Sequence, residues 1–280
     1  MVEILSFPHR DALEALLLQD PVCNLFLLGW LRQHELDRMP WFGAFDRGAL
    51  VGAALVVPGR LVVPYTPDAA WALRFGERFR ANRIPAGMVI GPRLSVDALW
   101  TTWQPGPPRI WYDQRLYVQD VPPEGPAVPG FRLATTRDAA ALVDASAEME
   151  REDLGRDPRD VEPEQHETVT RDRIRQGRSW VIERSGRIVF HIHVGSYLPE
   201  GAQVGGTYVP PDCRGQGLAT AGMAELGRRL LRGADAPARI TLHVHEQNAA
   251  AIRAYVRAGY RPAHAYRLAA VAGGGAGGTR

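Results

Sequence analysis

A glycine-rich stretch between a predicted strand and a predicted helix carries the residues best suited to hold phosphate. Arg214, Gly215 and Gly217 lie between an extended segment ending at Val209 and a helix predicted from about Gln216 to Arg232. The first N–H groups of a helix have no partner inside it and carry partial positive charge, and glycine lets an anion approach the backbone. The spacing is neither GxGxxG nor GxxxxGKS/T, so the dinucleotide and Walker-type loops are disfavoured. A tight turn that binds nothing is the alternative.

A second group of residues follows in LHVHEQNAAAIRAYVRAGY. Asn248 is a suitable helix N-cap, and Gly259 a suitable residue just past the end of the same helix. Tyr255 follows Asn248 by seven residues, which places both on one helical face. Its hydroxyl could donate a proton to a leaving group, or its ring could simply pack in the core.

In this order, the strand, the glycine-rich turn, the helix, the next strand and the Asn-capped helix resemble the GNAT superfamily of N-acetyltransferases. The resemblance covers about Phe131–Val271, and Val209–Ala219 match the family stretch V-x-P-x-x-R-G-x-G-x-A/G. It implies an enzyme that uses acetyl-CoA as acyl donor and a primary amine, of a small molecule or a peptide, as the attacking acceptor. The cofactor-binding residues that it implies are Val209, Pro210, Pro211, Arg214, Gly215, Gln216, Gly217, Leu218, Ala219, Thr220, Ala221, Gly222 and Asn248.

The resemblance also implies individual roles. Backbone N–H groups of Gly217–Gly222 would bind the pyrophosphate, Val209 and its neighbours would pair with the pantetheine arm, and Tyr255 would protonate the leaving thiolate. The general base is less well marked. His243 stands where members of the family often carry a glutamate, and it could equally be a histidine packed between strands. Glu148, Glu150 and Glu152 are rivals near the end of the preceding helix, and a water chain is a further possibility.

Two histidine pairs raise the question of a metal. His191 and His193, and likewise His243 and His245, alternate along predicted strands, so each pair shares a face. In the family order one strand lies between them, which separates the pairs by roughly 10 Å. That is too far for one zinc ion, so no metal is expected at these histidines.

Composition narrows the class of protein. The 280 residues are 45% hydrophobic with a formal charge of +2, which indicates an ordinary globular protein and argues against a nucleic-acid binder. Two distant cysteines, Cys23 and Cys213, fit a reducing cytoplasm, and no signal peptide or apolar run of ~20 residues is visible. We therefore expect a cytoplasmic monomer or homodimer with no membrane partner.

The pattern of strands and helices predicts a mixed α/β protein of two domains. The segment VPPEGPAVPG, residues 121–130, reads as a linker between a smaller N-terminal α/β domain, 1–120, and the GNAT domain, 131–271. Residues 272–280 form a glycine-rich tail expected to be flexible. One hypothesis is that the N-terminal domain is a degenerate copy of the same fold, because its strand RLVVPY leads into TPDAAW without the glycines.

Two other functions are compatible with the sequence. The chain could be a non-catalytic module that binds acyl-CoA and regulates or supports a partner, since the usual glutamate is missing. It could also be a structural two-domain protein whose glycine-rich turn binds nothing. The sequence also predicts three local features: a hairpin over Ser185-Gly186, a hydrophobic face on the helix at 216–232 and an acidic loop at 152–164.

Overall fold

The computed structural model describes residues 1–6, 9–36 and 40–271 and divides the chain into two compact units. The first unit holds Met1–Leu116, His243–Gln247 and the chain from Ala263 onward, and the second holds Tyr117–Leu242 and Asn248–Pro262. The first unit is therefore completed by two segments from the C-terminal half. The glycine-rich tail expected at 272–280 lies outside the described residues.

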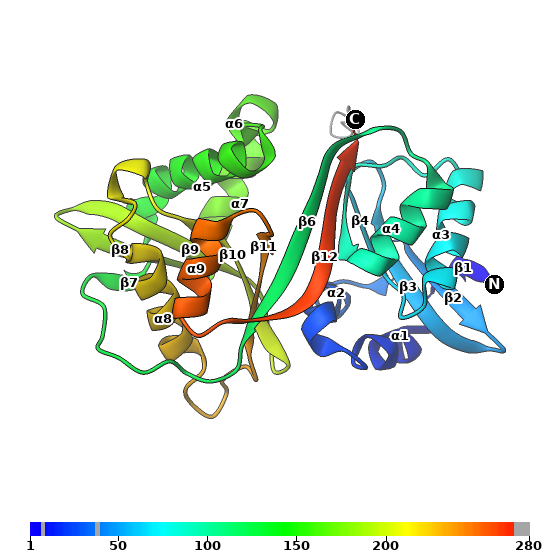
Figure 1. Cartoon of the computed structure of the whole chain (residues 1–280), viewed down its shortest axis with the longest axis horizontal. Helices are drawn as coiled ribbons and strands as arrows, with labels where there is room; N and C mark the ends of the chain where they lie inside the picture. Colours follow the sequence, from blue (N-terminus) through cyan, green and yellow to red (C-terminus); the bar gives the residue numbers. More distant parts are fainter. Residues whose placement is uncertain (7–8, 37–39, 272–280) are drawn as a thin grey trace. The chain divides into compact units, whose positions relative to one another are not determined.

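The elements of the N-terminal half run in the order strand, two helices, three strands, helix, strand, helix, strand (Figure 1). Their bounds are β1 Val2–Ile4, α1 Arg10–Leu17, α2 Pro21–Gln33, β2 Trp41–Asp46, β3 Ala49–Val57, β4 Leu61–Tyr65, α3 Ala69–Ala81, β5 Met88–Pro92, α4 Arg93–Trp103 and β6 Pro108–Gln119.

The sheet of the first unit is antiparallel from β1 to β4, and β5 then pairs parallel with β4. Strand β12 (Arg261–Val271) adds antiparallel to β5, with Ala269 opposite Val89. Phe75 and Phe79 of α3 pack with Trp103 of α4 over this sheet. Alternating apolar residues on the strands and the aromatic stripe on α3 thus build one core.

The turn after β4 is closed by its own side chains. The Ser95 hydroxyl accepts the Thr66 N–H at 3.1 Å and donates to the Thr66 carbonyl at 3.1 Å. Asp68 caps α3 by accepting the Ala70 N–H at 2.8 Å. The start of α3 therefore has a side-chain cap of its own, in a segment, TPDAAW, that lacks the glycines.

The C-terminal half repeats the same order, with one short helix added. Its bounds are β7 Phe131–Leu133, α5 Ala139–Leu154, α6 Pro158–Val161, α7 Pro163–Arg175, β8 Ser179–Arg184, β9 Arg187–Leu198, β10 Gly201–Tyr208, α8 Leu218–Leu230, β11 Ile240–His245, α9 Ala249–Arg257 and β12. This repetition is what a degenerate copy of one fold requires of the N-terminal half.

The sheet of the second unit is antiparallel from β7 to β10, and β10 then meets β11 in parallel. The predicted hairpin between β8 and β9 is confirmed, because Ser185 and Gly186 both have positive φ, 48° and 77°. The predicted 121–130 linker belongs to this unit, where the Arg228 guanidinium donates to the Pro126 carbonyl at 2.9 Å.

The loop expected over 152–164 is in large part helical, so that prediction is wrong. Helix α5 continues to Leu154 and α6 follows within four residues. Asp157 caps α6, and the Arg159 guanidinium bonds Asp157 as well as Asp144 and Glu148 of α5. Opposite charges one turn apart, together with a cap, make this charged stretch a good helix former.

In the part of the chain that the structure describes, no helix combines the length and the apolar character needed to cross a bilayer.

Candidate functional site

The glycine-rich turn leaves the start of α8 open. Gly215 and Gly217 have φ of 77° and 75°, and no atom lies within 4 Å of where a Cβ would stand on either. Gly217 is the N-cap, so the helix begins without a side-chain cap from this residue. The first helical bond runs from the Ala221 N–H to the Gly217 carbonyl at 2.9 Å. The N–H groups of Leu218–Thr220 therefore point out of the helix with no helical partner, which suits an anion.

The run of N–H groups without a helical partner is shorter than the Gly217–Gly222 expected from the sequence. The Ala221 N–H is already bonded within the helix, and Gly222 has a packing role. A Cβ on Gly222 would stand 2.5 Å from ring atoms of Phe190 on β9. Gly222 is therefore a glycine because α8 lies so close to the sheet.

Replacing Gly222 by alanine tests this packing role. We expect Gly222→Ala to lower the free energy of unfolding by about 1–3 kcal/mol, since the methyl group overlaps a buried ring. Urea unfolding measures the loss. Phe190→Leu in the same chain should recover part of it, whereas two strictly additive losses would contradict the contact.

Arg214 reaches away from the open turn. Its Nε donates to the Val209 carbonyl at 3.0 Å, and its Nη2 lies 2.9 and 2.8 Å from the two carboxylate oxygens of Glu152. The guanidinium also lies 5.7 Å from the centre of the Tyr208 ring. In this arrangement Arg214 fixes the chain between β10 and α8 rather than presenting a free charge to phosphate.

The second predicted motif lies beside the same strand end. The Asn248 side chain accepts the Ala251 N–H at 3.1 Å, and Gly259 has φ of 97°, so both predicted helix ends are confirmed. Tyr255 is 7% exposed, and its hydroxyl bonds the side chain of Thr207, the next-to-last residue of β10. Burial raises the pKa of Tyr255, which keeps the hydroxyl protonated at neutral pH.

Strand β10 diverges from its parallel neighbour before it ends. Within the described residues, β11 pairs with β10 only at Ala202 and Gln203, although β10 continues to Tyr208. On its other edge β10 pairs with β9, with a register irregularity between Gly205 and Tyr208. The final residues of β10 therefore have backbone groups on one edge that a ligand could pair with.

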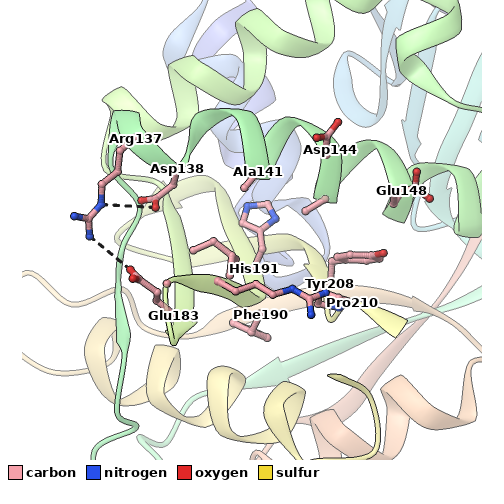
Figure 2. A pocket seen from close by; sticks show the side chains of 14 residues that line it. Arg137, Asp138, Ala141, Asp144, Glu148, Glu183, Phe190, His191, Tyr208 and Pro210 are labelled. Carbon is pink, nitrogen blue, oxygen red and sulfur yellow. Dashed lines mark ion pairs between the residues drawn. The ribbon is translucent and has the colours of Figure 1, made fainter. Parts of the chain in front are cut away.

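A cavity of about 640 Å³ lies on the opposite face of the sheet from α8, between α5 and the ends of β8–β10. Helix α5 lines it with Ala141, Asp144, Ala145 and Glu148, which fall on one helical face, and the two alanines leave room between helix and sheet. Figure 2 shows Asp144 and Glu148 along the helix and Tyr208 opposite them. The rest of the lining is Arg137, Asp138, Glu183, Gly186, Arg187, Ile188, Phe190, His191, Tyr208 and Pro210.

His191, like Asp138, is a buried polar residue of this cavity. It is 2% exposed, and neither ring nitrogen has a hydrogen-bond partner among the described residues. Its cross-strand neighbour is Tyr208. Burial, with the nearby charge of Arg173, lowers the pKa of His191 to about 3, so the ring is neutral and offers one donor and one acceptor.

Comparison with known proteins assigns part of the chain. Residues 144–260 match the model of the acetyltransferase (GNAT) family. These residues form a GNAT domain. The match begins within α5, at Asp144, and includes the glycine-rich turn and the helix that carries Tyr255. No curated protein sequence matches the chain significantly.

Solved structures extend the likeness to both halves. A GCN5-related N-acetyltransferase from Sphaerobacter thermophilus is 21% identical, with a TM-score of 0.65 over 96% of this chain and 94% of its own. A Drosophila protein is 16% identical, with a TM-score of 0.68 over 96% and 98%. A tandem GNAT protein from the clavulanic acid biosynthesis pathway is 15% identical, with a TM-score of 0.59 over 97% and 98%. At these identities the likeness shows the fold, which is the GNAT fold in a two-domain arrangement.

The three glutamates that could act as base in the GNAT domain are all paired with arginine. Glu148 bonds Arg151 and Arg159, which lowers its pKa, while Glu150 lies 2.8 Å from Arg156 and Glu152 holds Arg214. Of the three, Glu148 lines the cavity. A carboxylate in this setting stays charged at neutral pH and is better suited to hold a cationic amine than to remove its proton.

His243 lies within β11, but by its contacts it belongs to the first unit, which takes His243–Gln247. Its ring lies 4.4 Å from the Tyr266 ring, and burial lowers its pKa to about 4. The imidazole is therefore neutral at pH 7 but only weakly basic. As expected, β10 lies between the two strands that carry the histidine pairs, β9 and β11.

The buried neutral histidines make the fold sensitive to acid. Folding lowers the pKa of His191 and His243 from 6.5 to about 3 and 4, so the unfolded chain binds more protons below pH 6.5. Their contribution is complete above pH 6.5 and is lost as pH falls towards the folded values. Between pH 7.5 and 5.0 each histidine should lower the free energy of unfolding by about 2 kcal/mol. Urea unfolding at the two pH values measures the loss. His191→Asn should reduce the difference, and equal stability at both pH values would contradict the prediction.

Proposed function

We propose that the chain is an acetyl-CoA-dependent N-acetyltransferase that acetylates a primary amine. The observation that carries the proposal is the open, side-chain-free start of α8 beside the hydrogen-bonded pair Thr207 and Tyr255. Acetyl-CoA would supply an acyl group activated as a thioester. The N–H groups of Leu218–Thr220 would bind its diphosphate, and the free edge of β10 would pair with its amide-containing arm.

The end of β10 would separate donor from acceptor. Thr207 faces α8 and α9, where its hydroxyl bonds Tyr255 and lies 3.7 Å from the Met223 sulfur. Tyr208 faces the α5 cavity. Because successive side chains of a strand point to opposite faces, the proton donor and the cavity flank the same strand end. The cavity is thus placed to receive the acceptor.

The lining of the cavity favours an acceptor of a particular kind. Asp144 and Glu148 would attract the ammonium form of the amine, and neutral His191 would orient it through a hydrogen bond. Tyr255 would donate its proton to the departing thiolate, and backbone N–H groups on the free edge of β10 would stabilise negative charge on the carbonyl oxygen. The ammonium would lose one proton to solvent water before its nitrogen attacks the carbonyl carbon. A second proton would leave the nitrogen through water as the C–N bond forms and the C–S bond breaks, and water would return a proton to Tyr255.

The first unit is proposed to support the GNAT domain without a second cofactor site, because Ser95 and Asp68 already satisfy the turn and helix start after β4. Calorimetric titration with acetyl-CoA should therefore give one site per chain. A thiol-release assay with a panel of small amines and peptides then tests catalysis. Binding without thiol release for any amine would favour the acyl-CoA-binding module instead, and no binding would reject both.

A further inference from the structure

Three side chains with different metal-binding atoms meet in the first unit, away from the GNAT domain. Asp20 and Cys23 lie at the start of α2, and His264 lies on β12. One carboxylate oxygen, the thiol sulfur and one imidazole nitrogen all lie within 4.8 Å of one another. All three residues are partly buried, so the group is neither a surface cluster of acids nor a closed core.

Local structure holds the carboxylate in position. Asp20 is the N-cap of α2, and its Oδ1 accepts the Cys23 N–H at 3.1 Å. Its other oxygen, Oδ2, lies 3.4 Å from the His264 Nε2. The cap thus orients Asp20 so that its second oxygen faces the imidazole, as outer hydrogen bonds orient the ligands of metal sites.

Tyr266 holds the cysteine in the same way. It follows His264 by two residues on β12, so both side chains lie on one face of the strand. Its hydroxyl donates to the Cys23 carbonyl at 2.6 Å and lies 3.3 Å from the Cys23 sulfur. The carboxylate and the thiol are therefore held in position by local structure, and the imidazole lies beside the carboxylate.

We propose that Asp20, Cys23 and His264 bind one divalent transition-metal ion, Zn²⁺ in the first instance. Sulfur, imidazole nitrogen and carboxylate oxygen form a ligand set typical of zinc, and a sulfur ligand disfavours Mg²⁺ and Ca²⁺. The Asp20 and His264 side chains are 31% and 38% exposed, which leaves a path for the ion and room for water as fourth ligand. This site does not depend on the proposed acyl transfer.

Such an ion would fasten the last strand to the second helix. Cys23 and Tyr266 are 243 residues apart, and the hydrogen bonds between them already join α2 to β12. An ion that binds only the folded arrangement shifts the equilibrium towards it in proportion to its concentration. The metal would act as a clip within the first unit.

Cobalt absorption tests the proposal on the full chain after treatment with a chelator. Co²⁺ should bind with one equivalent per chain and give the near-ultraviolet charge-transfer band of a thiolate ligand, and Zn²⁺ should remove that band. Cys23→Ser should lose the band, whereas Cys213→Ser, which changes the buried cysteine of the second unit, should keep it. A band that persists in Cys23→Ser, or no band in the wild type, would overturn the proposal.

A second variant covers the case in which Cys23→Ser does not fold. His264→Gln keeps the size and polarity of the side chain, and we expect it to weaken Co²⁺ binding at least about tenfold. Zn²⁺ should raise the melting temperature of the wild type and of Cys213→Ser but not of His264→Gln. An equal rise in all three would mean that the ion binds elsewhere, and a cluster that serves only as a hydrogen-bonded tie would show no rise.

Discussion

Gly217→Asp should abolish acetyl-CoA binding while leaving the protein folded. The substitution places a carboxylate at the N-cap of α8, where the open N–H groups of Leu218–Thr220 would bind a diphosphate. The new side chain caps the helix itself and repels the incoming anion, so two effects act in the same direction. We expect the Kd for acetyl-CoA, measured by calorimetry, to rise at least about a hundredfold.

Gly177→Asp provides the matched control. Gly177 lies just past the end of α7 with φ of 65°, against 75° at Gly217, and no atom stands within 4 Å of a Cβ at either glycine. Both substitutions should therefore carry a similar backbone cost of about 1 kcal/mol. Equal acetyl-CoA affinity in wild type, Gly177→Asp and Gly217→Asp would show that the glycine-rich turn is only a turn.

Tyr255→Phe should lower turnover by at least about tenfold with little change in the Kd for acetyl-CoA. The substitution removes only the hydroxyl that bonds Thr207 and keeps the buried ring. A group that acts on the leaving thiolate affects the chemical step more than binding, so the loss should be in kcat. Thiol release with an amine accepted by the wild type measures it.

Tyr260→Phe separates this role from simple packing. Tyr260 is as buried as Tyr255, its ring lies 6.2 Å from the Tyr255 ring, and its hydroxyl has no hydrogen-bond partner within residues 40–271. Its loss should leave turnover unchanged and should not lower stability. If the two variants behave alike, Tyr255 is a core aromatic and not the acid.

Features set by neighbouring residues could be predicted from the sequence. The Ser185-Gly186 hairpin, the Asn248 cap and the Gly259 helix end each depend on the backbone preferences of a few adjacent residues. The glycine-rich turn is local for the same reason, since positive φ at Gly215 and Gly217 is a property of those residues. Together with the order of strands and helices, these signals were sufficient to identify the GNAT fold of the second half.

Contacts between distant segments could not be predicted. Nothing near Arg214 indicates that its partner is Glu152, and nothing near Cys23 points to His264 or Tyr266. The α5 cavity depends on how far a helix with two alanines lies from the sheet, which is decided by packing rather than periodicity. The acidic stretch after α5 is helical because ion pairs across two helices stabilise a segment whose composition alone suggests a loop.

The placement of β12 has a consequence for synthesis of the protein in the cell. Ala269 is a fully buried member of the first unit's core, and it pairs with Val89 on β5. The ribosome delivers Ala269 only after the whole second half has emerged. The first half of the nascent chain must therefore wait with an unpaired β5 edge, exposed to mispairing and to chaperones, until β12 has emerged.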